Sequence, residues 1–145
     1  MVGRRGRWGR GSVLILLDTH VVLWHECGDR RLGQRTRRLV ERALLRRQAA
    51  VSAISFWEVA MRVHGRHVDF LFDPEAWRRD LLAQGLTEIP VNGLIGVRAG
   101  LLEGLRGDPA DRLIVATALE GHQLVTADRR ILGWPGKLNR MDATE

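Results

Sequence analysis

An unbroken apolar run near the start of the chain ends on an acidic residue. Residues 13–17 are five consecutive apolar residues, and Asp18 and Thr19 follow directly. A run of this kind predicts a buried central strand of a parallel sheet. Because ligands of open α/β sheets bind outside the carboxyl ends of the strands, Asp18 is expected at the edge where chemistry takes place.

Length and composition favour a single globular domain. The chain has 145 residues, of which 45% are hydrophobic and 28% charged, and this is enough to bury a core. No apolar run approaches the ~20 residues that span a bilayer, and the start of the chain lacks the apolar segment of a signal peptide. Cys27 is the only cysteine, which excludes a disulfide framework or a zinc cage. We therefore expect a cytoplasmic protein without membrane contact.

The positive charge is concentrated at the N-terminus. The formal net charge is +6, but four arginines and no acid lie within residues 1–12, which leaves +2 for residues 13–145. We expect residues 1–12 to form a basic, flexible tail and residues 13–145 to form the folded domain. The charge is compatible with a nucleic-acid partner but does not identify one.

Strand and helix signals alternate through residues 13–145. Strands are predicted at residues 13–17, 49–52, 86–91 and 123–126. Helices are predicted at residues 19–26, 33–48, 55–63, from Asp73 and Pro74 onward, 94–105 and 108–120. Ser55 is interpreted as the N-cap of the third helix, with Glu58 completing a capping box. Gly96, Gly100 and Gly104 are expected to allow close packing of the fifth. The order predicts an α/β/α sandwich with a central, mainly parallel sheet.

Four carboxylates follow the predicted strands or begin the predicted helices: Asp18, Glu58, Asp111 and Asp128. In a parallel sheet these positions face the same edge. Carboxylates gathered there would repel one another unless a cation neutralised them. Oxygen ligands favour Mg²⁺ or Mn²⁺, and such ions support phosphodiester hydrolysis without a serine, cysteine or histidine nucleophile.

Each acid also has a purely structural interpretation. Asp18 and Asp128 are suited to capping, Glu58 to the capping box with Ser55, and Asp111 to stabilising the dipole of its helix. The five histidines are scattered along the sequence, and we assign them packing or solvent roles. A phospho-acceptor domain would need a second acid beside Asp18, where Thr19 stands. The co-occurrence of the four acids at one edge is what favours a catalytic site.

Four segments of the chain, in order, resemble the motifs of PIN-domain ribonucleases, and specifically of VapC-type toxins. They are residues 16–24 (LLDTHVVLW), 51–60 (VSAISFWEVA), 108–118 (DPADRLIVATA) and 124–128 (LVTAD). The resemblance implies that residues 13–145 form a PIN-like nuclease domain. It also implies a Mg²⁺- or Mn²⁺-dependent endoribonuclease that acts on RNA as the toxin of a toxin–antitoxin pair. The implied partners are a small cognate antitoxin and a second copy of the chain.

The resemblance assigns roles by position. It implies that Asp18 and Asp111 are the principal metal ligands, with Glu58 and the more variable Asp128 completing the catalytic set. Supporting polar residues are implied at Thr19, Ser55 and Thr126, and Asp108 is interpreted as a helix cap. Arg112 is predicted to contact an acid or the RNA phosphate.

Two positions depart from the subgroup pattern. Arg106 and Gly107 stand where a His-Arg pair is usual, and Arg62 stands where a lysine is usual. Both departures concern substrate contacts more than metal binding. The sequence also leaves open a housekeeping PIN-domain RNase and a non-catalytic RNA-binding module of the same fold.

Overall fold

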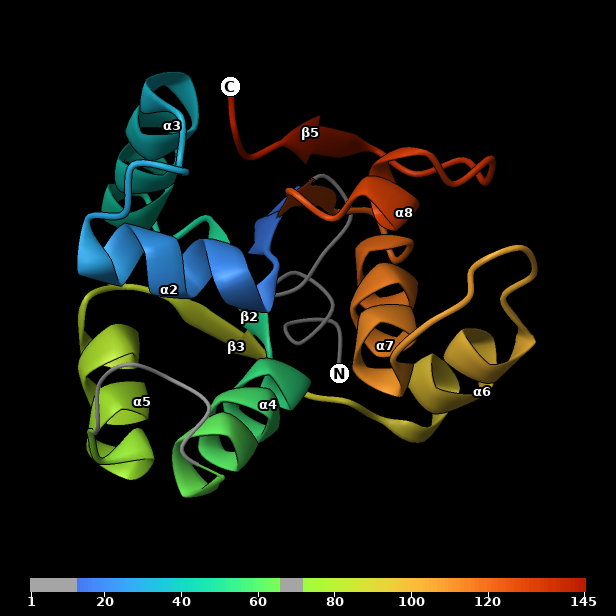
Figure 1. The fold of residues 1–145 in the computed structure, drawn as a ribbon, viewed down its shortest axis with the longest axis horizontal. Coiled ribbons are helices and arrows are strands. Elements are labelled where there is room, and N and C mark those ends of the chain that lie inside the picture. The colour runs from blue at the N-terminus through green and yellow to red at the C-terminus, as the bar shows by residue number, and fades with distance from the viewer. Residues whose placement is uncertain (1–12, 66–71) are drawn as a thin grey trace, which may run out of the picture.

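The computed structural model describes residues 13–65 and 72–145. The predicted basic tail, residues 1–12, lies outside the described residues. The folded part is a central sheet with helices packed on both of its faces (Figure 1).

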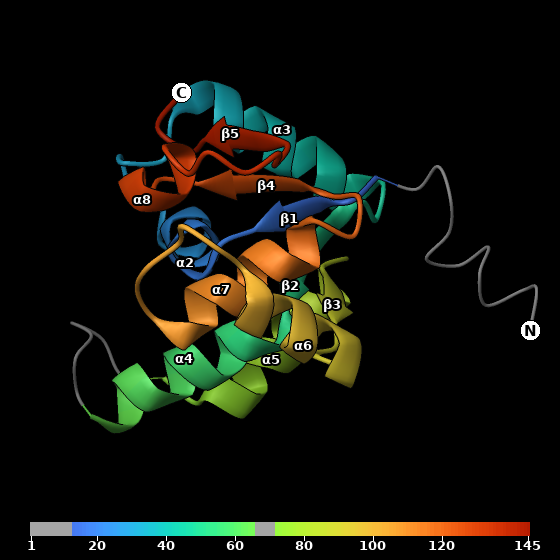
Figure 2. The same cartoon turned by 90° about the vertical axis from the view of Figure 1, so that its right-hand side faces the viewer.

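The sheet has five strands, all parallel, in the order β3-β2-β1-β4-β5. The strands are β1 (Ile15–Leu17), β2 (Ala49–Ser52), β3 (Thr87–Ile89), β4 (Gln123–Thr126) and β5 (Arg140–Asp142). The first strand is central, as its apolar run predicts, with Leu17 in register with Val51 on one side and Val125 on the other. Figure 2 shows β1, β4 and β5 side by side. The predicted parallel sheet is confirmed.

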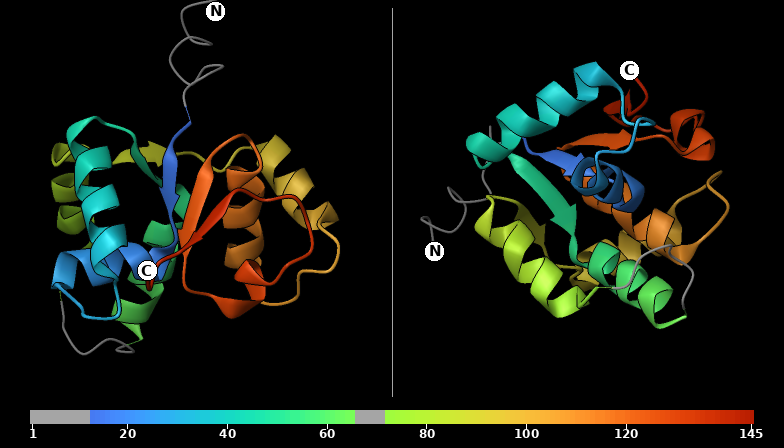
Figure 3. Two further views of the ribbon diagram at one scale, coloured as in Figure 1. Left: turned by 90° about the horizontal axis from the view of Figure 1, so that it is seen from above. Right: turned by 60° about the vertical axis from the view of Figure 1, so that its left-hand side comes forward.

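Two hydrophobic clusters fill the two faces of the sheet. Neighbouring residues of a strand point to opposite faces, and Leu16 and Leu17 accordingly belong to different clusters. The helices are α2 (Thr19–Cys27), α3 (Gln34–Leu45), α4 (Ala53–His64), α5 (Pro74–Ala83), α6 (Gly93–Leu101), α7 (Pro109–Ala118) and α8 (Arg129–Leu132). Figure 3 shows α3 on one side of the sheet and α6 and α7 on the other. The α/β/α sandwich is therefore confirmed, and no described helix has the length and apolarity that crossing a membrane requires.

The helix after β2 begins two residues earlier than predicted, and a different serine caps it. Ser52 has extended backbone angles, and its side chain accepts from the backbone N–H of Ile54 at 3.2 Å. Ser55 is consequently buried inside the helix rather than at its cap. The predicted capping box between Ser55 and Glu58 is wrong, and both side chains are available for other contacts.

The structure differs from the sequence analysis at α6 and at a fifth strand. Helix α6 ends at Leu101, and a Cβ placed on Gly96 or Gly100 would meet nothing within 4 Å, so these glycines do not mediate close packing. Gly104 lies beyond the helix with φ +75°, a conformation that glycine adopts without strain. Strand β5 was not predicted, since its sequence Arg-Met-Asp has no apolar run. It forms because the free edge of β4 supplies backbone partners.

Candidate active site

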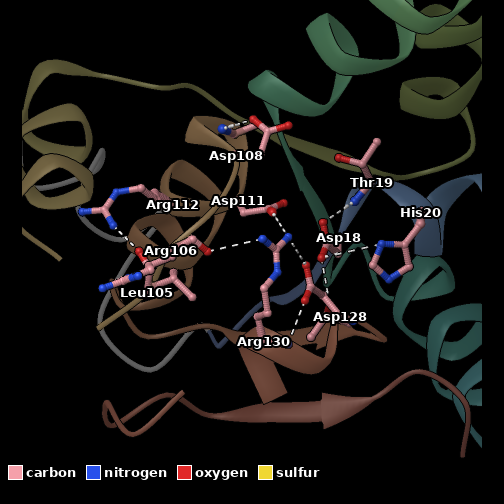
Figure 4. A network of polar contacts seen from close by, with 12 residues as sticks. Asp18, Thr19, His20, Leu105, Arg106, Asp108, Asp111, Arg112, Asp128 and Arg130 are labelled. Atoms are coloured by element: carbon pink, nitrogen blue, oxygen red, sulfur yellow. Dashed lines mark hydrogen bonds and ion pairs between the residues drawn. The ribbon is translucent and has the colours of Figure 1, made fainter. Parts of the chain in front are cut away.

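The four predicted acids lie at the carboxyl edge of the sheet. Asp18 follows β1 and caps α2, and Asp128 follows β4 and caps α8. Glu58 lies in α4 after β2, and Asp111 lies in the first turn of α7. In Figure 4 the side chains of Asp18, Asp111 and Asp128 point toward a common space. The convergence that the parallel topology predicts is present.

Asp18 is buried and held by two hydrogen bonds. Its Oδ1 accepts from the Thr19 backbone N–H at 2.8 Å, and its Oδ2 accepts from Thr126 Oγ1 at 2.7 Å. Thr126 Oγ1 also accepts from the backbone N–H of Asp128 at 3.0 Å. Asp18 is thus both a helix cap and a member of the cluster, so the two interpretations do not exclude each other.

Glu58 is positioned by a pair of buried hydroxyls. Thr19 Oγ1 donates to Glu58 Oε1 and lies 2.7 Å from Ser55 Oγ. Thr19 and Ser55 are both almost completely buried. These contacts join α2 to α4 and fix the glutamate beside Asp18. Burial raises the pKa of Glu58, and the negative charge of Asp18 raises it further. Of the three predicted supporting residues, Thr19 and Thr126 therefore contact a predicted acid directly, and Ser55 contacts Thr19.

The acids influence one another electrostatically. The pKa of Asp111 is raised to about 7, first by burial and then by the negative charges of Asp18, Asp128, Glu58 and Asp108. Burial also raises the pKa of Glu58, while the hydrogen bond from Thr19 lowers it. Desolvation and like charges both disfavour ionised carboxylates, so a positive charge placed among them is stabilised.

The donor set fits a hard divalent cation. The side chains that converge are carboxylates and hydroxyls, the oxygen donors that Mg²⁺ and Mn²⁺ prefer. The pKa of Asp111 is raised first by burial and then by the negative charge of its neighbours, a charge that such a cation would neutralise. Within residues 13–65 and 72–145, no group of three or more His, Cys, Asp and Glu side chains already stands in position to hold an ion.

His20 is a site residue that the sequence prediction missed. Its Nε2 accepts from the backbone N–H of Ala127 at 2.9 Å, so the proton of the neutral ring lies on Nδ1. Nδ1 lies 3.7 Å from Asp18 Oδ2, and the ring is packed against Trp24 with a centroid distance of 5.0 Å. His20 therefore directs an N–H toward the buried carboxylate. Its place two residues after Asp18, in the first turn of α2, was the available signal.

Arg130 is a second missed residue. Its Nη2 lies 3.3 Å from Asp111 Oδ2 and 3.4 Å from Asp128 Oδ2. Figure 4 shows the guanidinium between these two carboxylates. The sequence offered only its spacing of two residues from Asp128, and many surface arginines of this chain have an acid as near in sequence.

Arg112 and Asp108 have structural contacts. The Arg112 guanidinium donates to three backbone carbonyls, those of Gly100, Leu102 and Leu105, and points away from the acids (Figure 4). In the structure its contacts are thus with backbone carbonyls, and the predicted contact with an acid or the RNA phosphate stays a prediction. Asp108 caps α7 by accepting from the backbone N–H of Ala110 at 2.9 Å, as predicted.

The family model of the PIN domain matches residues 15–133 of the chain. The protein belongs to the PIN-domain family. A curated relative, Ribonuclease VapC22 of Mycobacterium tuberculosis, is 34% identical over 118 residues, which cover 81% of this chain and 88% of the relative.

Solved structures share the fold at lower identity. A toxin–antitoxin complex from Klebsiella pneumoniae contains a chain that is 23% identical, with a TM-score of 0.59 and coverage of 89% of this chain and 97% of that one. DNA-bound VapBC from Salmonella typhimurium gives 17% identity, a TM-score of 0.64 and coverage of 90% and 98%. VapBC2 from Rickettsia felis, bound to a promoter DNA fragment, gives 17% identity and a TM-score of 0.60, with coverage of 89% of this chain and 98% of that one. At these identities the likeness shows the fold.

Proposed function

We propose that this protein is a metal-dependent endoribonuclease and the toxin of a toxin–antitoxin pair. One observation carries the proposal: four acids from separate segments meet at one edge, where Asp111 has a pKa of about 7 because of its burial and its charged neighbours. Membership of the PIN family and the 34% identity to a protein named a ribonuclease support the choice of RNA as substrate.

We assign the metal ligands to the acidic cluster. Asp18 and Asp111 would be the principal ligands of Mg²⁺ or Mn²⁺, with Glu58 and Asp128 completing the set. When bound, such an ion lowers the pKa of a water molecule and stabilises negative charge on a phosphodiester. The protein contributes positioning, because oriented ligands spare the cost of reorganisation during the reaction.

The chain's own residues set that positioning. Thr126 and the N–H of Thr19 fix the two oxygens of Asp18, and Thr19 with Ser55 fixes Glu58. His20 directs its Nδ1 side toward Asp18. Since neighbours that orient metal ligands tune affinity strongly, we assign Thr19, Ser55, Thr126 and His20 to orientation and the four acids to catalysis.

The partners follow from the same proposal. The solved neighbours include a toxin–antitoxin complex and two DNA-bound VapBC complexes. We propose that a small cognate antitoxin binds this chain, that two copies of the chain associate, and that the protein works in the cytoplasm on cellular RNA. We also propose that residues 13–145 form one nuclease domain. Growth arrest on expression, relieved by co-expression of a small neighbouring protein, is the expected result for a toxin.

Cleavage of an RNA pool by the purified protein tests the enzymatic part. We expect cleavage that requires Mg²⁺ or Mn²⁺ and is lost in Asp18→Asn. A non-catalytic RNA-binding module would instead bind RNA equally with or without a chelator. A housekeeping RNase would cleave RNA while its expression left growth unaffected.

A further inference from the structure

A guanidinium occupies the space between two carboxylates of the acidic cluster. Nη2 of Arg130 lies within 3.4 Å of one oxygen of Asp111 and one of Asp128, and Nη1 donates to the Arg106 carbonyl at 3.5 Å (Figure 4). The hydrogen bond with Asp128 is the main reason that the pKa of Arg130 is raised. Arg130 is therefore the side chain that supplies positive charge to this part of the cluster.

The adjoining loop leaves room for this guanidinium. Gly107 has φ +131°, in the region that favours glycine, and a Cβ placed there would collide with Arg130, 3.0 Å from its Cζ. The carbonyl that Nη1 contacts belongs to the preceding residue, Arg106. Space and a hydrogen-bond acceptor are thus provided at the same point of the loop.

We propose that Arg130 competes with the divalent cation for Asp111 and Asp128, an inference that rests on the metal-dependent function above. The guanidinium and the metal ion would bind the same two carboxylates. An ion such as Mg²⁺ coordinates oxygen at about 2.0–2.1 Å and demands near-ideal octahedral geometry, which leaves no room for a guanidinium between the two ligands. Arg130 therefore holds these carboxylates in the metal-free protein and leaves Asp111 when the ion binds.

The contacts are weak enough for this exchange. The Arg130 side chain is 57% exposed, and exposed ion pairs contribute little because water screens them. Its flexible stem starts on α8, a four-residue helix at the surface. The guanidinium can therefore move into solvent without disturbing the core, and its contacts set the metal concentration at which the site fills.

Arg129 provides a matched control. It lies on the same helix and carries the same charge, but its guanidinium contacts Asp142 at 3.2 Å, on β5. Replacing either arginine by alanine removes one positive charge from the same region. A difference between the two variants therefore reports the contacts of Arg130 rather than the long-range field.

Calorimetric titration of Mn²⁺ into the full-length protein, in the absence of RNA, tests the competition. Arg130→Ala should bind Mn²⁺ about three- to tenfold more tightly than wild type, the size that two partly exposed ion pairs support. Arg129→Ala should change the Kd less than about twofold. Equal effects of the two variants, or weaker binding by Arg130→Ala, would overturn the proposal.

Nuclear magnetic resonance supplies a readout that is independent of charge removal. The Nε–Hε resonance of Arg130, assigned by its disappearance in Arg130→Ala, should shift during a Mg²⁺ titration in step with binding, whereas that of Arg129 should not. An unmoved Arg130 resonance at saturating Mg²⁺ would contradict displacement.

If wild type cleaves RNA but the two variants bind Mn²⁺ alike, this inference fails and the nuclease function stands. If no form binds a divalent ion, the metal-dependent function itself fails.

Discussion

Thr126 holds Asp18 by a hydrogen bond of 2.7 Å from its hydroxyl to Oδ2, and the same hydroxyl accepts the N–H of Asp128. The two partners follow different strands, β1 and β4, which are neighbours in the sheet. A buried threonine at the end of one strand thus orients the acid at the end of the next.

Replacing Thr126 by valine should weaken metal binding and RNA cleavage about 10- to 100-fold, the usual cost of losing a residue that orients a metal ligand. The shape of the side chain is kept, so the loss should come from the two hydrogen bonds of the hydroxyl, to Asp18 and from the N–H of Asp128. Calorimetry with Mn²⁺ and cleavage rates measure the two effects.

Thr117→Val is the matched control for that substitution. Thr117 is equally buried, but its hydroxyl donates to the Leu113 carbonyl within α7. Its loss should lower the free energy of unfolding by about 1 kcal/mol and leave cleavage unchanged. If both variants lose cleavage to the same extent, the orienting role of Thr126 is refuted.

The two serines of the second motif should separate stability from activity. Ser52→Ala removes the N-cap of α4 and should cost about 1 kcal/mol of stability with cleavage largely kept. Ser55→Ala removes the hydroxyl beside Thr19 and should reduce cleavage more than Ser52→Ala does. Chemical denaturation and cleavage assays on both variants check this, and the reverse pattern would restore Ser55 as the cap.

The raised pKa of Asp111 predicts a pH dependence of the metal-free protein. Its pKa is about 7 in the folded state against a usual 3.8, so the folded state binds the proton more tightly than the unfolded state does. The free energy of unfolding therefore carries no penalty from Asp111 below about pH 4. It falls as the pH rises from about 4 to the folded pKa of about 7, and the full penalty is present above that pH. Asp111→Asn cannot ionise and so removes this penalty. The difference in free energy of unfolding between the variant and wild type should be about 2 kcal/mol more favourable to the variant at pH 8 than at pH 4, an amount reduced for partial solvent exposure.

Thermal unfolding in a chelator at the two pH values measures that gain. A gain of the same size at pH 4 would show that Asp111 is uncharged or paired throughout and would contradict the raised pKa. In wild type the same proton competes with the metal, so Mn²⁺ affinity should fall as the pH is lowered below 7.

The sequence predicted the elements that dominate the site. The apolar run at residues 13–17 identified the central strand, and the acid after it identified the edge. Because all strands are parallel, the acids associated with β1, β2 and β4 converge without any knowledge of side-chain geometry. Parallel topology therefore permits Asp18, Glu58 and Asp128 to face one edge, whereas the place of Asp111 depends on how α7 packs.

What the sequence did not predict depends on local competition. Ser52 and Ser55 both have the residue type of a cap, and only the start of α4 decides between them. His20 contacts Ala127, which is 107 positions away in sequence, and Arg130 contacts Asp111, which is 19 positions away. Strand β5 consists of half-exposed residues without an apolar run, and its pairing with β4 creates it. These features follow from the assembled sheet rather than from any short segment.

The most direct test of the account is RNA cleavage by purified wild type and Asp18→Asn with and without Mg²⁺ or Mn²⁺. The substitution keeps the size of a buried residue that is 3% exposed, removes its negative charge and replaces one accepting oxygen by an NH2 group. Wild type should cleave RNA only with the metal ion, and the variant should lose at least about 1,000-fold of that activity while its thermal unfolding stays cooperative. Undiminished cleavage by Asp18→Asn, or wild-type cleavage that persists in chelator, would contradict the account.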